Sequence, residues 1–228
     1  ECSVMSMGTH KTETIDIHGG GIDLVFPHHE NEIAQSEAAT GKQFVKYWLH
    51  NGHLNIRGEK MSKSLGNMML VRNLLEKYDK NVVRLFLLSA HYRSPMNFSE
   101  EDMERTKKAY RRIYEAMSYS QPGITVKTTF EVNHENIQVD IQSEICTNNN
   151  IPEVNSTDSY LVEFQNYMDD DFNTEAALGV LFKIINKMNI VFHETGNNEK
   201  KQKSDELKKL SAVAKRILAI FNLTIIYS

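Results

Sequence analysis

Cysteine is scarce in this sequence, since Cys2 and Cys146 are the only two among 228 residues. Two cysteines are too few for the disulfide framework that stabilises small secreted proteins, and they fit a reducing compartment. No signal peptide, with its charged start and short apolar core, opens the chain. We therefore expect a cytoplasmic protein.

Long apolar runs and an excess of positive charge are also missing. No window approaches the roughly 20 uncharged apolar residues that span a bilayer, so we expect no membrane partner. The formal net charge is -4, whereas a protein that works mainly by coating phosphates is usually basic. The negative net charge therefore argues against a protein that covers nucleic acid with its whole surface, but not against one that contacts nucleic acid through a local face.

Glycines and turn residues divide the chain into regions. Residues 1–70 hold short apolar runs between glycines and histidines, which predicts a small α/β portion. Residues 71–120 and 158–228 have helical periodicity, whereas residues 121–157 contain proline, glycine and an asparagine run without a period. We expect an α/β portion, a helical connecting region, a loop-rich insertion and an antiparallel helical bundle. Because the chain starts at Glu1 rather than Met, we expect a fragment of a longer protein.

Capping residues predict where the helices begin and end. A helix over about 30–40 should end at Gly41, residues 70–90 are helical, and another helix follows from 158 to about 168. Ser99 and Asn173 are expected N-caps of two longer helices, and a last helix should span 199–221. Apolar residues at helical spacing in these two longer helices are Met103, Tyr110, Ile113, Tyr114 and Met117, then Ala177, Val180, Leu181, Ile184, Ile185, Met188 and Val191.

Residue types that bind metals stand at the start of the first helix. His28 and Glu32 are four positions apart and share one helix face. Together with Cys2 they offer a sulfur, an imidazole and a carboxylate, a ligand set that zinc accepts. His29 is an alternative ligand that the spacing leaves open. The alternative without a metal is a polar helix start whose acids face the positive end of the dipole.

Two other enzyme classes are excluded by their motifs. A metalloprotease needs His-Glu-x-x-His, but the last position counted from His29 is Ile33. Esterases with the His-Gly-Gly-Gly found at residues 18–21 also need Gly-x-Ser-x-Gly, which the sequence lacks. The glycines after His18 therefore predict a flexible turn where backbone N–H groups approach a ligand closely. Asp23 could accept hydrogen bonds from a ribose, and a plain turn is the alternative.

Two lysines flank small hydroxyl residues in the segment Lys60-Met61-Ser62-Lys63-Ser64. Glycines on both sides allow such a segment to move and to bring its cations around a polyphosphate. Attack on an α-phosphate builds charge on the phosphate oxygens, and preplaced cations stabilise that charge. A solvated loop is the alternative that this chemistry alone leaves open.

As a signature, residues 60–64 match the second motif of class I aminoacyl-tRNA synthetases at every position. Residues 16–21, 27–36 and 48–52 closely resemble cysteinyl-tRNA synthetases, and 168–174 resembles the head of that family's helical domain. The resemblance covers most of residues 1–120 and 160–222. It implies part of a class I nucleotide-binding domain, followed by a helical bundle on the tRNA-stem side.

The resemblance also implies roles for single residues. Cys2, His28 and Glu32 match three of the family's four zinc ligands, and zinc would bind the thiolate of the substrate cysteine. Serine's alcohol is far more basic and would gain much less from the metal, which selects against it. The resemblance implies that Lys63, His18, Gly20 and Asp23 bind ATP, with Trp48 and His50 close by. It also implies that Lys60 and Lys63 stabilise the transition state, assisted by magnesium.

The implied reaction is attack of the cysteine carboxylate on the α-phosphate of ATP, followed by transfer of the cysteinyl group to tRNA(Cys). We expect the protein to be a monomer. The first signature of the class, His-x-Gly-His, is not present, so we expect this chain by itself not to activate cysteine. One alternative is a paralogue that joins cysteine to a small amine, as in mycothiol biosynthesis. Another is a non-catalytic module stabilised by zinc. Neither alternative needs to bind tRNA.

Overall fold

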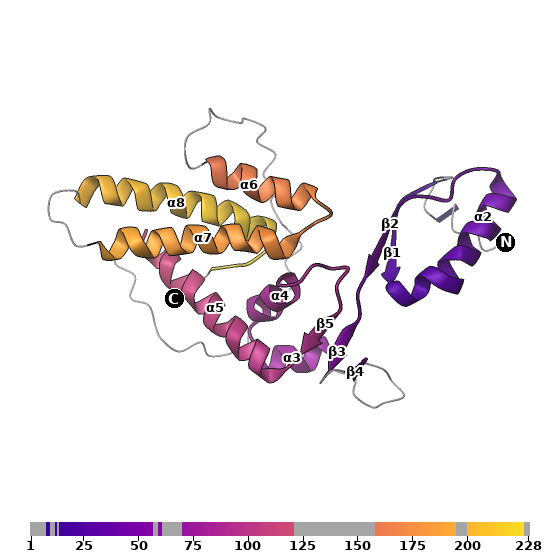
Figure 1. Cartoon of the computed structure of the whole chain (residues 1–228), viewed down its shortest axis with the longest axis horizontal. Coiled ribbons are helices and arrows are strands. Elements are labelled where there is room, and N and C mark those ends of the chain that lie inside the picture. Colours follow the sequence, from indigo (N-terminus) through magenta and orange to yellow (C-terminus); the bar gives the residue numbers. More distant parts are fainter. Residues whose placement is uncertain are drawn as a thin grey trace. The chain divides into compact units, whose positions relative to one another are not determined.

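The computed structural model describes residues 8–9, 12, 14–56, 59–60, 70–120, 158–194 and 200–225. The chain folds as two compact units (Figure 1). The N-terminal unit comprises Glu1–Met68 and Tyr92–Phe98, and the helical unit comprises Met69–His91 and Ser99–Ser228.

A parallel pair of strands forms the centre of the N-terminal unit. Strand β1 (Ile15–Gly21) pairs with β2 (Val45–Asn51), and helix α2 (Glu30–Thr40) lies between them in the sequence. Parallel strands need such a crossover. The helical turns η1 (Ile22–Leu24) and η2 (Val25–His29) lead from β1 into α2. Gly41 ends α2 in the left-handed conformation, with φ of 67°, which confirms the predicted C-cap.

A second, three-stranded sheet completes this unit. Its order is β4 (Glu59–Lys60), β3 (Leu54–Ile56) and β5 (Met96–Phe98), with β3 antiparallel to β4 and parallel to β5. Strand β5 falls within residues 71–120, a region whose sequence predicted helices. Pro95 prevents a helix from continuing there, and Phe98 is buried while Asn97 is exposed, as in a strand.

Six helices make up the described part of the helical unit. They are α3 (Val71–Lys77), α4 (Lys80–Leu88), α5 (Glu100–Ser118), α6 (Asp158–Asp169), α7 (Thr174–His193) and α8 (Lys200–Ile220). Figure 1 shows α6 and α8 lying along α7. All twelve apolar residues predicted for the stripes of α5 and α7 are buried, which confirms them as the core.

Side chains cap three of these helices. Ser99 accepts a hydrogen bond from the backbone N–H of Asp102 at 3.1 Å, and Asn173 accepts one from Ala176 at 3.1 Å, as the sequence predicted. Asp79 caps α4 by accepting from the backbone N–H of Asn81 at 2.7 Å. This unpredicted cap starts α4 and divides the 70–90 region into two helices.

Helix α7 bears on the expectation that no segment of the chain spans a membrane. It has the length and apolar composition of a membrane-crossing helix. One side of it is nevertheless buried in the core of the bundle, through Ala177, Leu178, Val180, Leu181, Ile184, Ile185, Met188 and Val191. A core helix meets the same criteria because both must carry apolar residues on most of their faces.

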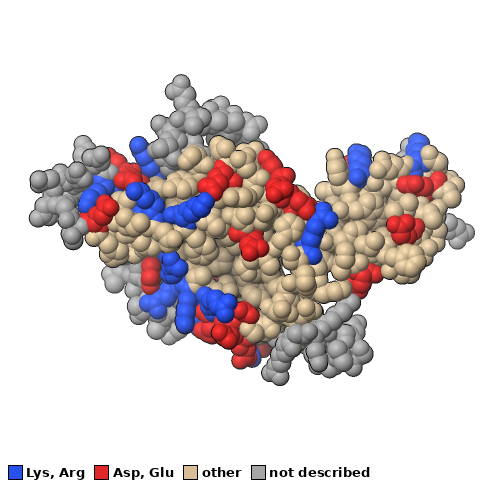
Figure 2. All heavy atoms as spheres, in the orientation of Figure 1, with Lys and Arg blue, Asp and Glu red and all other residues tan. Residues whose placement is uncertain are grey.

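Charges of both signs are mixed over the molecule. On the face drawn in Figure 2, lysines and arginines lie next to acidic residues along the helices. Within the helical unit, Arg111 contacts Glu115 at 2.7 Å, and Lys187 of α7 contacts Glu206 of α8 at 3.6 Å. The described residues of this unit therefore present ion pairs rather than a surface of one sign.

Candidate active site

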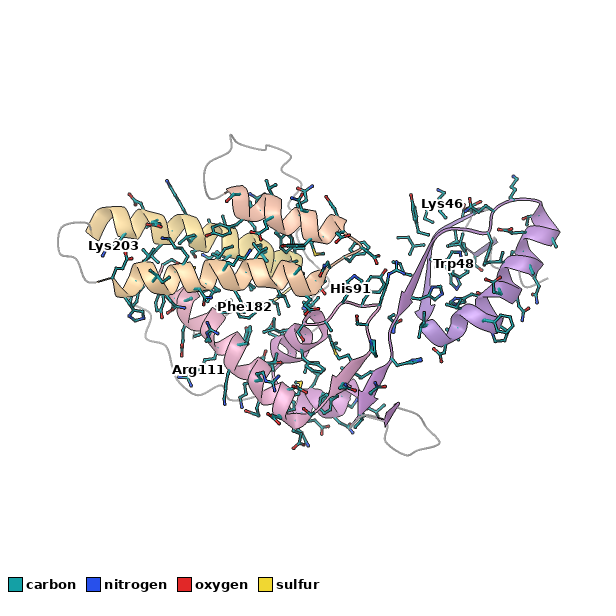
Figure 3. All side chains as sticks on the ribbon, viewed as in Figure 1. Lys46, Trp48, His91, Arg111, Phe182 and Lys203 are labelled. Atoms are coloured by element: carbon teal, nitrogen blue, oxygen red, sulfur yellow. The ribbon has the colours of Figure 1, made fainter. Side chains whose placement is uncertain are left out.

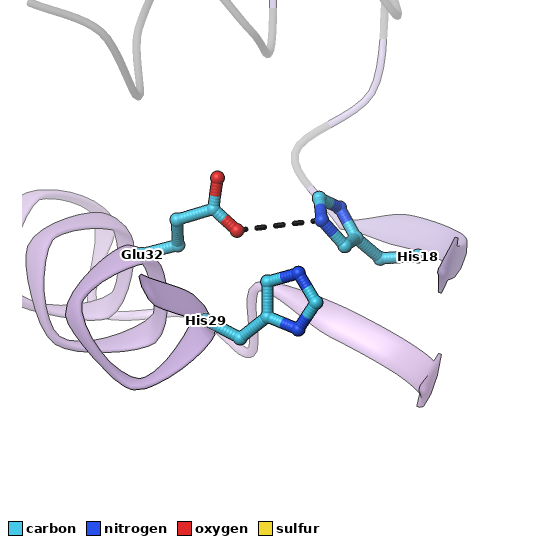
Figure 4. Close-up of side chains that lie close together, drawn as sticks. All are labelled: His18, His29 and Glu32. Carbon is cyan, nitrogen blue, oxygen red and sulfur yellow. Dashed lines mark ion pairs between the residues drawn. The ribbon is translucent and has the colours of Figure 1, made fainter. Parts of the chain in front are cut away.

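The Glu32 carboxylate lies between two histidines from different elements. Its Oε1 is 3.4 Å from Nε2 of His28, one turn earlier, and its Oε2 is 3.3 Å from Nε2 of His18 on β1 (Figure 4). The side chain of His28 is 60% exposed, whereas those of His18 and Glu32 are 26% and 32% exposed. The structure therefore brings together the predicted pair His28 and Glu32 and adds His18.

One oxygen of this carboxylate lacks a hydrogen bond. Among the described residues, Oε2 of Glu32 is the buried side-chain polar atom without a hydrogen-bond partner. His18 is near it, but the contact does not have hydrogen-bond geometry. Leaving a buried charged oxygen unsatisfied is costly, so an additional partner would stabilise it. A bound cation is such a partner.

His29 is the buried residue of this cluster. Its Nδ1 lies 2.8 Å from Nε2 of His50 on β2, so one of these two nitrogens donates a hydrogen bond to the other. Its ring centre is 4.9 Å from those of His18 and Trp48. Burial, followed by the neighbouring His18, lowers the pKa of His29 below its usual value. The neutral imidazole is therefore favoured.

Two overlapping sets of residues could hold a metal here. The ligand atoms of His18, His29 and Glu32 all lie within 4.8 Å of one another. The set predicted from the resemblance shares Glu32 but uses His28 and Cys2 in place of the other two. Imidazole and carboxylate ligands in either set suit zinc. The Nδ1 of His29 is already engaged by His50, which leaves only its Nε2 for a ligand.

The glycines after His18 are a correction to the sequence analysis. They were expected to form a flexible turn, but Gly19, Gly20 and Gly21 complete strand β1, with Gly20 beside His50 of β2. A side chain at Gly20 would come within 2.8 Å of the His29 ring. Glycine is therefore required because the imidazole packs against the strand, and not because the backbone turns.

Asp23 follows this strand in the turn η1, where it is half-exposed. Its Oδ1 lies 4.0 Å from Nδ1 of His53, which follows β2. A side chain at Gly21 would meet the same oxygen at 2.5 Å. The predicted ribose acceptor therefore lies next to the end of β1, close to the last glycine.

The remaining predicted site residues are not described in the same detail. Cys2, Lys63 and the 121–157 insertion lie outside the described residues. Lys60 is the last residue of β4, but its side chain also lies outside what the structure describes.

Sequence reasoning missed the contacts among the histidines. His29 was treated as a possible ligand, and nothing in the sequence indicated its contact with His50, which is 21 residues away. Trp48 was expected near this site or in the core, and Figure 3 shows it between the strands and α2. Its ring lies 4.9 Å from His18. The only signal in the sequence was the resemblance, which implied that Trp48 and His50 lie close to the ATP site.

Comparison with known proteins matches both parts of the chain. The family of tRNA synthetases class I (C) catalytic domains matches residues 1–108, and the DALR domain matches residues 163–222. A methionyl-tRNA synthetase from Mycobacterium tuberculosis, solved with methionyl-adenylate, aligns with a TM-score of 0.58 at 16% identity, over 89% of this chain and 41% of that one. A leucyl-tRNA synthetase from Agrobacterium radiobacter, in a ternary complex with tRNA and LeuAMS, also has a TM-score of 0.58, at 15% identity over 90% of this chain and 25% of that one. These matches define the fold as part of a class I tRNA synthetase followed by a helical domain.

More similar relatives narrow the family. Cysteine–tRNA ligases from Geotalea uraniireducens and Geobacter metallireducens are 46% and 45% identical to the chain, over 94% and 93% of its length. The chain spans 41% and 42% of those two relatives. It is therefore similar to part of the cysteine–tRNA ligases, over less than half of the length of these two relatives.

Proposed function

We propose that the protein represented by this chain activates cysteine with ATP and transfers it to tRNA(Cys). The observation that carries this proposal is the Glu32 carboxylate, flanked by His18 and His28 and with a buried oxygen that lacks a hydrogen bond. In a chain similar to cysteine–tRNA ligases, a metal-binding group at this position suits an enzyme that must recognise a thiol. Because the Glu32 carboxylate and its neighbouring histidine suit a cation such as zinc, they support a role for this site in recognising the substrate side chain.

Zinc would be held by Cys2, His28 and Glu32. When bound, it would supply a soft Lewis acid that accepts a thiolate and disfavours the alcohol of serine. His18 contacts the second oxygen of Glu32 and would orient the carboxylate toward the metal. The neutral form of His29, favoured by its burial, adds no positive charge beside the cation.

ATP would bind at the end of β1. In open α/β sheets, ligands bind outside the carboxyl ends of the parallel strands, and His18, Gly20 and Asp23 lie at that end of β1. Asp23 would accept hydrogen bonds from the ribose. Lys60 and Lys63, with magnesium, would stabilise the charge that develops on the α-phosphate as the cysteine carboxylate attacks it.

The helical unit would contact tRNA(Cys), and the protein would work as a cytoplasmic monomer. The leucyl enzyme with a similar fold was solved with tRNA, and the methionyl enzyme with its adenylate. These structures support the same two-step chemistry here, through an aminoacyl-adenylate. A paralogue that joins cysteine to a small amine would share the first step and would not need tRNA.

Pyrophosphate exchange by the complete protein tests the proposal. With ATP present, exchange is expected with cysteine, and neither with serine nor without an amino acid. Charging of tRNA(Cys) should then follow, whereas transfer to a small amine alone would support the paralogue. A zinc-loaded complete protein that shows no cysteine-dependent exchange would contradict the proposal and favour a non-catalytic module.

A further inference from the structure

The two oxygens of the Glu32 carboxylate face different histidines. Oε1 lies 3.4 Å from Nε2 of His28, whose side chain is 60% exposed, and Oε2 lies 3.3 Å from Nε2 of His18. Among the described residues, Oε2 is also the buried side-chain polar atom without a hydrogen-bond partner. The carboxylate therefore has an outer side, where His28 belongs to the zinc site of the proposed function, and an inner side, which faces His18.

A second histidine points toward the inner side. Figure 4 shows the ring of His29, the residue just before α2, pointing toward Glu32 and His18. The ligand atoms of these three residues all lie within 4.8 Å of one another. Ligands held roughly 2.0–2.2 Å from a tetrahedral zinc ion lie about 3.3–3.6 Å apart. The 3.3 Å separation of His18 and Glu32 fits this spacing, and a small rotation of the side chains would bring the third ligand to it.

The ring of His29 is held in an orientation that leaves one nitrogen for a ligand. Its Nδ1 lies 2.8 Å from Nε2 of His50, and the residue is only 3% exposed. A histidine that binds a metal through one ring nitrogen almost always donates a hydrogen bond from the other, which fixes its tautomer. Donation from Nδ1 to His50 would leave the lone pair on Nε2. The contact with His50 therefore provides the support that a metal-binding His29 needs.

Gly20 of β1 lies against the edge of the His29 ring that carries Nε2. A Cβ at this position would lie 3.1 Å from Nε2 and 2.8 Å from Cε1 of that ring. Both distances are shorter than an ordinary van der Waals contact, so a side chain would crowd the nitrogen that is left for a ligand. Glycine at this position keeps that edge of the ring uncrowded on the side of β1, the strand that also carries His18.

We propose that His18, His29 and Glu32 form an inner metal site, which binds a divalent ion such as zinc or cobalt. This inner site needs neither Cys2 nor His28. Two imidazoles and a carboxylate are a ligand set of catalytic zinc sites, which keep a fourth position open for water. Because Glu32 is shared with the zinc site of the proposed function, one chain would use the two sites as alternatives. The inner site would hold a metal even in a protein that does not activate cysteine, so it stands apart from that function.

The inner site would keep a metal under conditions that disable the outer one. A cysteine binds a metal as its thiolate, so oxidation or alkylation of Cys2 would remove a ligand from the outer site. The inner site has only nitrogen and oxygen ligands, and the same change would leave its ligands intact. The two sites are therefore distinguished by whether metal binding depends on a thiolate.

Cobalt binding to the full chain tests the inner site. Cobalt(II) bound to a thiolate has a charge-transfer absorption in the near ultraviolet, which nitrogen and oxygen ligands do not give. The double variant Cys2→Ala/His28→Ala is expected to bind one cobalt ion per chain without this absorption. Adding His18→Gln should weaken the binding at least about tenfold, since even the loss of a residue that supports a ligand costs that much. His53, in the same unit, has a similar exposure of 31%, and adding His53→Gln instead should leave the affinity unchanged.

Two outcomes would overturn the proposal. Loss of cobalt binding in Cys2→Ala/His28→Ala, with the circular dichroism of the unaltered chain retained, would show that the outer ligands are required. Binding that survives the addition of His18→Gln would place the metal elsewhere.

A second measurement covers a double variant that does not fold. Alkylation of both cysteines in the unaltered chain should remove the thiolate absorption and leave one cobalt ion bound, whereas loss of the ion would contradict the inner site. Pyrophosphate exchange by the complete protein is measured separately, so failure of the inner site leaves the proposed function standing, and the reverse also holds.

Discussion

The two units differ sharply in how much core they contain. Among the described residues, the buried apolar side chains of the N-terminal unit are Phe44, Val45 and Phe98, whereas those of the helical unit line four helices or more. The N-terminal unit also leaves large apolar residues in solvent. Ile17, Phe26 and Tyr47 are 59%, 76% and 68% exposed. The helical unit has the core of an independent domain, and the described part of the N-terminal unit does not.

The difference follows from the kind of sheet involved. Parallel sheets normally have both faces covered, because their crossover helices pack on them. Here α2 and the histidine cluster occupy one face, and the paired residues Ile17 and Tyr47 lie uncovered. In the helical unit, by contrast, the segment after the last helix packs back against the first ones. Asn81 and Tyr110, from α4 and α5, hydrogen-bond the backbone of Thr224 after α8 at 2.9 and 2.5 Å.

The largest expected effect concerns the core of α7. Ile185 is fully buried, so Ile185→Ala should lower the free energy of unfolding of the helical unit by about 3 kcal/mol, through lost burial and a residual cavity. Ile190, on the same helix, is 54% exposed, and Ile190→Ala should change the free energy of unfolding by less than about 0.5 kcal/mol. Urea unfolding followed by circular dichroism measures both. Equal effects would mean that the bundle is not the independent core described above.

Zinc should stabilise the other unit. At a free zinc concentration about 100 times the dissociation constant, the N-terminal unit should gain about 2.7 kcal/mol, and the helical unit nothing. Zinc content and amide exchange in each unit, before and after chelation, measure this. Glu32→Gln should abolish the gain, while Asp16→Asn, which changes a 76% exposed acid on β1 of the same unit, should preserve it. A gain that survives Glu32→Gln would place the metal elsewhere.

The same contrast separates what the sequence could predict from what it could not. Helix caps are local, so Ser99, Asn173 and Gly41 could be identified from their own neighbours. The apolar stripes of α5 and α7 were equally visible, because helical periodicity needs only one helix. The strand conformation of Gly19–Gly21 was missed, since the requirement for glycine at Gly20 comes from the ring of His29, a contact made only on folding. The site depends on such distant contacts more than the bundle does.

A smaller effect is expected from a helix cap. Asn173→Ala removes the side-chain acceptor for the backbone N–H of Ala176 and should cost the helical unit about 1 kcal/mol. Asn166, exposed within α6, is the control, because alanine at that position should be neutral or slightly stabilising. Thermal unfolding of both variants makes the comparison. A loss in Asn166→Ala as large as in Asn173→Ala would remove the cap as the explanation.

Alkaline pH should also act on the helical unit. Burial, followed by Glu115, raises the pKa of Tyr119, which stacks on Phe192 with ring centres 3.9 Å apart. The unfolded chain then loses this proton first, at a pH of about 10, so stability falls as the pH rises from there toward the folded pKa. Tyr119→Phe should make this loss of stability smaller. Part of the loss should remain, because burial also raises the pKa of Tyr78. Denaturant midpoints at pH 8 and above pH 10 would test it, and identical pH profiles for both proteins would contradict it.

The smallest effect is expected on the uncovered sheet face. Tyr47 is 68% exposed beside Ile17, so Tyr47→Thr, which keeps a residue favourable for strands, should change stability by less than about 0.5 kcal/mol. Val45, two residues earlier and only 3% exposed, is the matched control, and Val45→Ala should cost more than about 1 kcal/mol. Exchange protection of β1 and β2 measures both variants in the intact chain. If Tyr47→Thr costs as much as Val45→Ala, Tyr47 is covered in solution, and the contrast between the two units fails at this position.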